Sequence, residues 1–199
     1  MFTEIKSQDG TLTGYSDDET GELFSRFLAG LCFSGFCVII GERYGGQEDS
    51  FRHLKVLAEH SESSLHELVK RVGALQGLYP VNSWLADREE VNAGLAKLFR
   101  EFAQELDVKV SLTQPSLPSD LNLALQVIRR RLKQRTLLFP RDGILAGKIE
   151  ALARTDPREA KAENFQEVVV LGAVIHRLDT SGGPVKAYRP SQPPSAMSA

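Results

Sequence analysis

The sequence predicts an α/β fold in which a mixed sheet is flanked by helices. Residues 36–40 form a continuous β-branched and aromatic run, which is typical of a strand covered on both faces. After Ser64, apolar residues recur at helical spacing, and strand-like and helical segments then alternate with short links. Strands joined through helices pair in parallel, whereas strands joined by a short link pair as a hairpin. A sheet with both kinds of pairing follows.

Residues 1–32 are expected to form an N-terminal extension. The segments 2–6 and 11–15 flank the turn signal Asp9-Gly10 and predict a small hairpin. A short helix is expected over residues 20–31, because Thr20 can cap it and apolar side chains recur on one face.

Residues 33–179 are expected to form the main domain. Its expected strands cover residues 36–40, 51–59, 81–86 and 108–112. Its expected helices cover residues 64–79, 91–106, 121–132, 144–152 and 156–178. The first of these helices carries a capping box, in which Ser64 is followed three residues later by Glu67. Residues 180–199 are rich in glycine and proline and are expected to be a disordered tail.

Composition places the chain among ordinary globular proteins. It has 199 residues, 42% hydrophobic and 25% charged residues, and a net charge of −2. No overall basic field attracts nucleic acid, so such binding would need a local patch. Cys32 and Cys37 lie in or beside apolar sequence and are expected to be buried thiols in a reducing compartment. With no secretory signal and no apolar run of about 20 residues, a cytoplasmic location is expected.

Four acids fall at the ends of predicted elements. Glu42 follows the apolar run, Asp87 follows the strand over residues 81–86, and Glu163 and Glu167 lie one turn apart near the start of the last apolar segment. Ligand sites of open α/β sheets gather at the carboxyl ends of strands. Carboxylates that converge there repel one another unless a divalent cation neutralises them. The plain alternative is that these acids, like most of the 26 in the chain, are solvated surface.

These elements and acids, over residues 35–179, resemble the nuclease domain of phage terminase large subunits, a branch of the ribonuclease H-like superfamily. The family places its first catalytic acid at the position of Glu42, its second at Asp87, and an acidic start of its last helix at residues 162–168. The resemblance implies hydrolysis of nucleic-acid phosphodiesters with two Mg²⁺ or Mn²⁺ ions. Glu42, Asp87 and Glu163 would be the catalytic ligands, with Glu167 in reserve. It also implies double-stranded DNA as substrate, a packaging motor or portal protein as partner, and the host cytoplasm as location.

Two departures from the family leave activity open. The family usually has aspartate where this chain has Glu42 and Glu163, and the longer side chain displaces the carboxylate. No Gly-x-x-x-x-Gly-Lys-Ser/Thr motif is present, so the packaging ATPase is absent from this sequence. Three interpretations therefore remain: a metal-dependent nuclease, a catalytically silent module used in binding or assembly, and a small-molecule enzyme that uses the same cleft.

The densest positive charge lies near the end of the helix expected over residues 121–132. It consists of Arg129, Arg130, Arg131, Lys133 and Arg135. These side chains are candidates for contacts with a phosphate backbone, which would make binding dependent on salt. They cannot all share one helix face, and a solvated face with acidic neighbours is the alternative.

Overall fold

One mixed sheet organises the molecule in the computed structural model of the chain. The structure describes residues 1–43, 53–81, 83–86, 89–114, 120–140, 142–156 and 159–181, with no side-chain detail for 89–92. In this part of the chain the strands are β1 Phe2–Lys6, β2 Leu12–Asp17, β3 Leu23–Cys32, β4 Phe36–Arg43, β5 His53–Ser61, β6 Trp84–Ala86, β7 Leu112–Thr113 and β8 Leu137–Leu138. The helices are α1 Leu65–Leu78, α2 Glu89–Glu105, α3 Leu121–Lys133, α4 Ile144–Arg154, the short 3-10 turn η1 Ala162–Asn164, and α5 Gln166–Thr180.

The long strand β3 is the centre of the sheet. It pairs antiparallel with β4 and parallel with β6, while β5 continues the antiparallel meander beyond β4. β7 extends the parallel side next to β6, and β8 lies parallel to β5 at the other edge. The hairpin β1–β2 joins the first residues of β3. The expected α/β class, a mixed sheet flanked by helices, is confirmed.

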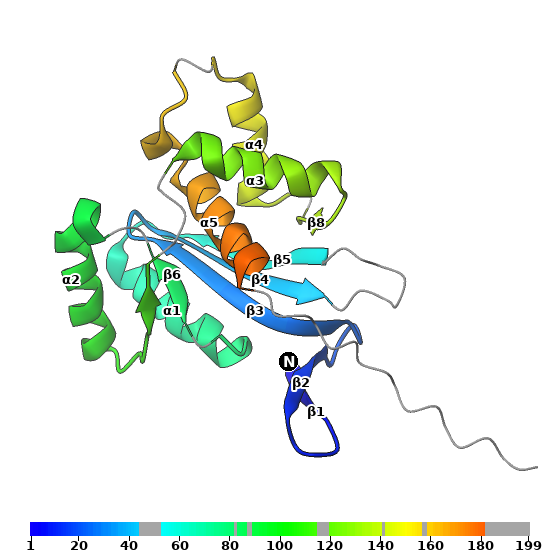
Figure 1. Ribbon diagram of the computed structural model, residues 1–199. Helices are drawn as coiled ribbons and strands as arrows, with labels where there is room; N and C mark the ends of the chain where they lie inside the picture. Colours follow the sequence, from blue (N-terminus) through cyan, green and yellow to red (C-terminus); the bar gives the residue numbers. More distant parts are fainter. Residues whose placement is uncertain are drawn as a thin grey trace, which may run out of the picture.

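Helices cover both faces of this sheet (Figure 1). On one face, α1 and α2 pack against Cys37 and Ile39 of β4 and against Trp84 of β6. On the other face, α5 lies against β3 and β4, and α3 and α4 pack on α5. The alternation along β4 explains this division, because Val38 and Ile40 point to the α5 face. Within the described residues, no helix is long and apolar enough to cross a bilayer.

Two close approaches bring α5 near the sheet and α3 near α5. A Cβ on Gly30 of β3 would lie 2.6 Å from methyl groups of Val170 and Val174. A Cβ on Gly172 of α5 would lie 2.5 Å from the Cβ of Ala124 on α3. Since neither glycine has a side chain, the backbones of strand, helix and second helix stack more closely than larger residues allow.

A neighbouring strand supplies the cap of α4. Gly143 stands at the N-cap of α4 and offers no side-chain acceptor. Glu59 of β5 fills this role, because its Oε2 accepts a hydrogen bond from the Leu145 amide at 2.8 Å. A carboxylate at a helix N-terminus also interacts favourably with the helix dipole.

The helix expected over residues 20–31 is wrong, because these residues contain β3. The apolar spacing in this segment fits a helix, but Phe27, Ala29 and Leu31 face α1 and α2 while Leu28, Gly30 and Cys32 face α5. A strand buried on both faces carries no period of two, so its apolar run does not distinguish it from a helix. A domain boundary after residue 32 would therefore fall inside the β3–β4 hairpin.

The bounds of the other elements differ less from those expected from the sequence. The hairpin at the N-terminus and the helix beginning after Ser64 are confirmed, and the Ser64 hydroxyl accepts from the Glu67 amide as expected. The strand expected over residues 108–112 is shorter and later, as β7. The last helix begins at Gln166, ten residues after Asp156, because η1 and a turn precede it. Residues 182–199 lie outside the described residues, so the expected tail stays a prediction.

Candidate functional site at the two ends of the central strand

At the first end of β3, Glu42 forms a buried ion pair. Glu42 lies on β4 directly across from Arg26 and is 1% exposed. Its Oε2 accepts from Arg26 Nε at 2.6 Å and from the Ser25 hydroxyl at 3.2 Å. The other guanidinium nitrogens of Arg26 donate to the Leu178 carbonyl at 2.7 Å and to the Ser181 hydroxyl at 3.0 Å. Arg26 and Glu42 therefore fasten the carboxyl end of α5 to the sheet.

At the second end of β3, neutral side chains meet. The Cys32 thiol lies 2.8 Å from Gln166 Oε1, at the start of α5, and 2.7 Å from the Ser34 hydroxyl. Leu31 pairs with Ala86, the last residue of β6. Asp87, which follows Ala86, lies outside the described residues.

The two ends are too far apart to share ligands. Arg26, the partner of Glu42, and Leu31, the partner of Ala86, are five residues apart on β3. At 3.3 Å per residue they are separated by about 16 Å. The reason is strand direction: β4 runs antiparallel to β3 and β6 runs parallel, so their carboxyl ends lie at opposite edges. The expectation that Glu42 converges with the acid after β6 is wrong.

The other two candidate acids within the described residues, Glu163 and Glu167, each have a basic partner. Glu167 on α5 lies 2.9 Å from Lys148 Nζ on α4. Glu163 in η1 is exposed and lies 3.8 Å from Lys161 Nζ. Glu163 and Glu167 precede or begin α5, so they belong to the Cys32 end and not to the Glu42 end.

The described residues do not fit a centre of two metal ions. Among them, no group of three or more histidine, cysteine, aspartate or glutamate side chains is close enough together to hold an ion. The atoms that meet at the second end are a thiol, a hydroxyl and an amide, whereas Mg²⁺ and Mn²⁺ prefer carboxylates. The expected ions, Mg²⁺ or Mn²⁺, therefore lack a ligand set in this part of the chain.

The cysteines are buried free thiols, as expected. Burial, and to a smaller extent the nearby Glu62 carboxylate, raise the pKa of Cys37 to about 12. A thiol with this pKa stays protonated at neutral pH and is not a nucleophile.

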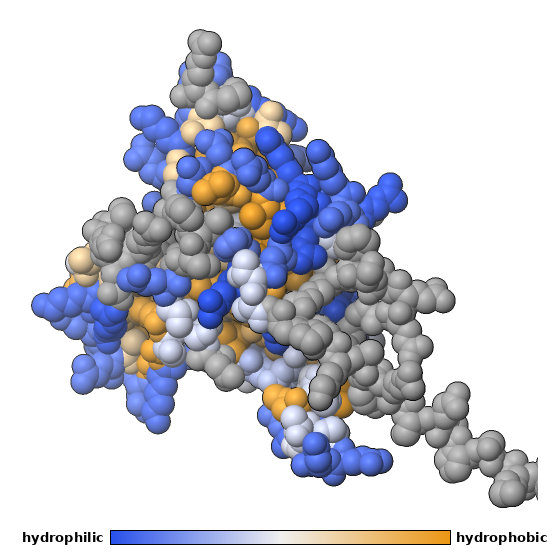
Figure 2. Space-filling model, viewed as in Figure 1, coloured by the Kyte–Doolittle hydropathy of each residue, from blue (hydrophilic) through white to orange (hydrophobic). Residues whose placement is uncertain are grey.

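The basic cluster divides into an anchored part and a free-standing part. Arg131 is 7% exposed, and both Arg131 and Arg130 donate to the Asp179 carboxylate on α5. The side chains of Arg129, Lys133 and Arg135 are exposed. Figure 2 shows strongly hydrophilic side chains gathered over the C-terminal part of α3. We call Arg129, Arg130, Lys133 and Arg135 the α3 basic patch.

Arg26 and Asp179 are the two important residues that the sequence did not single out. Arg26 lies within residues 20–31, the segment that the sequence predicts to be a helix, so its place opposite Glu42 on a strand was not expected. No local signal marks Asp179, because its partners lie 48 and 49 positions earlier in the chain. Only the packing of α3 across α5 brings these residues together.

Comparison with known proteins finds a structural neighbour and no sequence relative. No family model matches the chain, and no curated protein matches it. The chain is similar to the crystal structure of the large terminase nuclease from thermophilic phage G20c, with a TM-score of 0.47 and 12% identity. The match covers 81% of this chain and 90% of that one.

Proposed function

We propose that this chain is a catalytically silent ribonuclease H-like module that acts by binding, with nucleic acid as its partner. The observation that carries the proposal is the state of Glu42. Its carboxylate is buried against Arg26, about 16 Å along β3 from the end where β6 finishes. A carboxylate in this position ties α5 to the sheet and is not available to a metal ion beside Asp87.

The α3 basic patch is the surface that would contact the nucleic acid. Its cations lie in and just after the last turn of α3, where they also interact favourably with the helix dipole. Asp179 holds Arg130 in place, which lowers the entropy lost when the patch meets a phosphate backbone. Contacts to phosphates carry no base information, so binding would be largely independent of sequence, with double-stranded DNA as the expected form.

A salt titration of DNA binding tests this proposal. We expect a fluorescently labelled short duplex to bind the protein and to lose affinity steeply as salt rises. The double variant Arg129→Glu/Lys133→Glu should lower the slope of log affinity against log salt by about 2, because each phosphate contact contributes about 0.9. The matched control is Lys97→Glu/Lys109→Glu, which makes the same change of charge on exposed residues away from α3. Equal losses in the two double variants would contradict the assignment of the patch.

Metal-dependent phosphodiester hydrolysis is the second candidate function. One observation favours it: Gln166 touches Cys32, so Glu163 and the residue after β6 belong to the same end of the sheet. If the chain has this second function, its expected partners are those that the resemblance implies, a packaging motor or a portal protein. Nicking of supercoiled plasmid with Mn²⁺, abolished by Asp87→Asn, would overturn the silent module. We expect no nicking above a control with chelator.

A further inference from the structure

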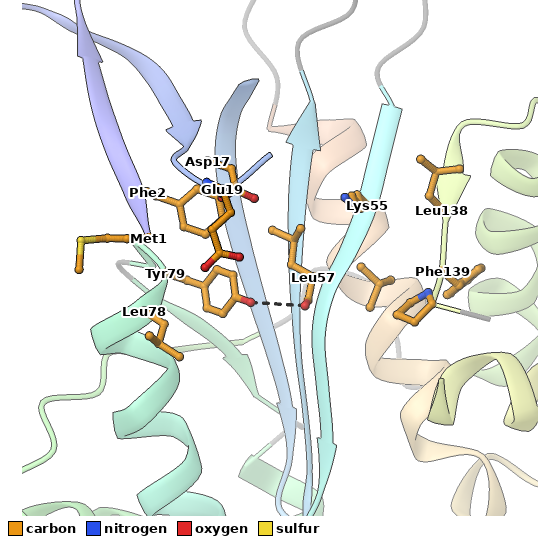
Figure 3. Close-up of a pocket in the computed structure, with 12 residues that line it drawn as sticks. Met1, Phe2, Asp17, Glu19, Lys55, Leu57, Leu78, Tyr79, Leu138 and Phe139 are labelled. Carbon is orange, nitrogen blue, oxygen red and sulfur yellow. Dashed lines mark hydrogen bonds between the residues drawn. The ribbon is translucent and has the colours of Figure 1, made fainter. Parts of the chain in front are cut away.

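A cavity of about 540 Å³ lies on the α1 face of the sheet, where α1 no longer covers it. α1 ends at Leu78, and the space beyond is bounded by the β1–β2 hairpin, by β5 and by β8. Figure 3 shows Phe2, Asp17, Glu19 and Tyr79 on one side of this cavity and Leu138 and Phe139 on the other. Cavities of this size hold drug-sized ligands or a few peptide side chains.

The lining is largely apolar and partly exposed. The rings of Phe2 and Tyr79 stand side by side with centroids 5.4 Å apart, and the Tyr79 hydroxyl donates to the Leu57 carbonyl at 3.4 Å. Leu78 is 60% exposed and Leu138 is 40% exposed, although both are large apolar side chains. Exposed apolar groups gathered around a hollow are a mark of an interaction site.

Two carboxylates stand in one wall of the lining. Asp17 and Glu19 belong to the same wall, and hydrogen bonds from the Glu19 amide and the Thr20 hydroxyl lower the pKa of Asp17, so its carboxylate stays ionised. The cations in the described lining are Lys55, which is engaged at 2.6 Å by Glu22, and the Met1 ammonium, whose charge also lowers the pKa of Asp17. An occupant that brings a positive charge to Glu19 and an apolar body to the rest of the lining would complement this surface.

We propose that this cavity is the docking site of residues 182–194 of the same chain. This segment lies outside the described residues, and its sequence supplies the required chemistry. Residues 182–199 contain no acid, and Lys186 and Arg189 flank Ala187 and Tyr188. Pro184, Pro190, Pro193 and Pro194 favour the extended polyproline conformation, which aromatic-lined grooves recognise.

The segment starts close enough to reach the cavity. Ser181, the last described residue, touches Arg26, which pairs with Glu42 on β4, and Glu42 is opposite Leu54 on β5. Lys55, the next residue, lines the cavity on the other face of the sheet. The chain must therefore pass round one edge of the sheet, and 13 extended residues span about 40 Å, several times the thickness of a sheet.

Paramagnetic relaxation in the full-length protein tests the proposal. A spin label would be placed at Ser191→Cys, since Cys32 and Cys37 are buried and should not react. We expect the methyl signals of Leu57 and Leu138 to broaden, while those of Leu98 on α2 stay sharp. Lys186→Glu/Arg189→Glu should remove most of the broadening. Sharp signals from Leu57 and Leu138 in the labelled chain without further substitutions would overturn the proposal.

Two controls separate docking at this cavity from a general effect of net charge and from docking between molecules. Glu19→Lys should remove most of the broadening, whereas Glu4→Lys, the same change on the exposed strand β1, should leave it intact. Equal effects would show that only net charge matters and would overturn the assigned site. Mixing spin-labelled chains with isotope-labelled chains detects docking between molecules. Broadening seen only in that mixture would assign the cavity to a second copy and overturn docking within one chain.

Discussion

The two ends of β3 are built from opposite chemistries. At the Arg26 end, the Arg26 guanidinium donates hydrogen bonds to the buried Glu42 carboxylate and to the Leu178 carbonyl of α5. Asp179, also on α5, forms a second ion pair, with Arg131 of α3. At the Cys32 end, the described atoms that meet on β3 are those of a thiol, a hydroxyl and an amide. α5 runs between them, beginning at the neutral end and finishing at the charged one. The start of this helix is thus held to β3 by neutral contacts and to α4 by the Glu167–Lys148 ion pair, whereas its end is held to α3 by the ion pairs of Asp179 and to the sheet through Arg26.

The charged end shows how the carboxylates of Glu42 and Asp179 are used. A metal centre needs several acids in one place, whereas here the charged end pairs each acid with a cation. Removing a partner from a buried pair is expected to cost more than removing a neutral contact, because an uncompensated charge remains. Substitutions at the charged end should therefore destabilise the protein more than substitutions at the neutral end.

The largest effect is expected for Arg26→Met. The substitution leaves Glu42 buried without its guanidinium and releases the Leu178 carbonyl, so the free energy of unfolding should fall by about 3–5 kcal/mol. Urea denaturation followed by the fluorescence of Trp84 measures this. The double variant Arg26→Met/Glu42→Leu should recover most of the loss. A loss below about 1 kcal/mol in the single variant, the range of an exposed pair, would contradict a structural role for the pair.

The next largest effect is expected in the middle of α5, for Gly172→Ala. The new Cβ would lie 2.6 Å from the Ala124 Cα, and relief requires α3 to move, so we expect a loss of about 1–3 kcal/mol. Gly147→Ala on α4 is the matched control, because nothing lies within 4 Å of its Cβ position. This control should stabilise the protein by about 0.5–1 kcal/mol. Both are measured by urea denaturation, and equal signs would contradict the close crossing.

A smaller effect is expected at the neutral end, for Gln166→Leu. The variant removes the acceptor for the Cys32 thiol without leaving a buried charge, so the loss should be about 1 kcal/mol. Urea denaturation of this variant beside Arg26→Met compares the two ends directly. A loss in the free energy of unfolding as large as that of Arg26→Met would contradict the expected difference between the two ends.

The smallest effect is expected from a change of pH that protonates His60, which lies on β5 opposite Cys37. His60 pairs with Cys37 across β4 and β5, and burial and then Arg71 lower its pKa from 6.5 while Glu62 acts in the opposite direction. The folded state then binds the proton less well than the unfolded chain. The stability that neutral His60 contributes should be fully present above pH 6.5, and it should be lost as pH falls through the pKa of His60 in the folded state. Thermal unfolding of the protein and of His60→Gln checks this, and parallel profiles would contradict it.

The sequence predicted those elements whose pattern is local. The helix after Ser64 has one apolar face and a cap, and the N-terminal hairpin has an Asp9-Gly10 turn, so both were found. β3 was missed because a strand buried on both faces resembles a helix in composition. That one error also moved the central strand, because it made β4 the first strand of the expected sheet. Glu42 was then placed at the wrong edge.

The candidate site was harder to predict than the fold. Whether two strand ends meet depends on the direction of each strand, and a single missed strand reverses that direction for its neighbours. The basic cluster lies at the C-terminal end of α3, and its contact with nucleic acid stays a prediction. Its division into anchored and exposed side chains depends on Asp179, and no pattern in the sequence links Asp179 to α3.

Because Glu59 of β5 caps α4, this helix is expected to form only after β5 has joined the sheet. The first turn of α4 depends on a carboxylate that arrives only when Glu59 is already in the sheet. An isolated peptide of residues 143–155 should therefore remain mostly unstructured, since short helices without a cap are marginal in water. In the intact protein, amide protons of that turn should exchange no more slowly than those of the strand that holds them.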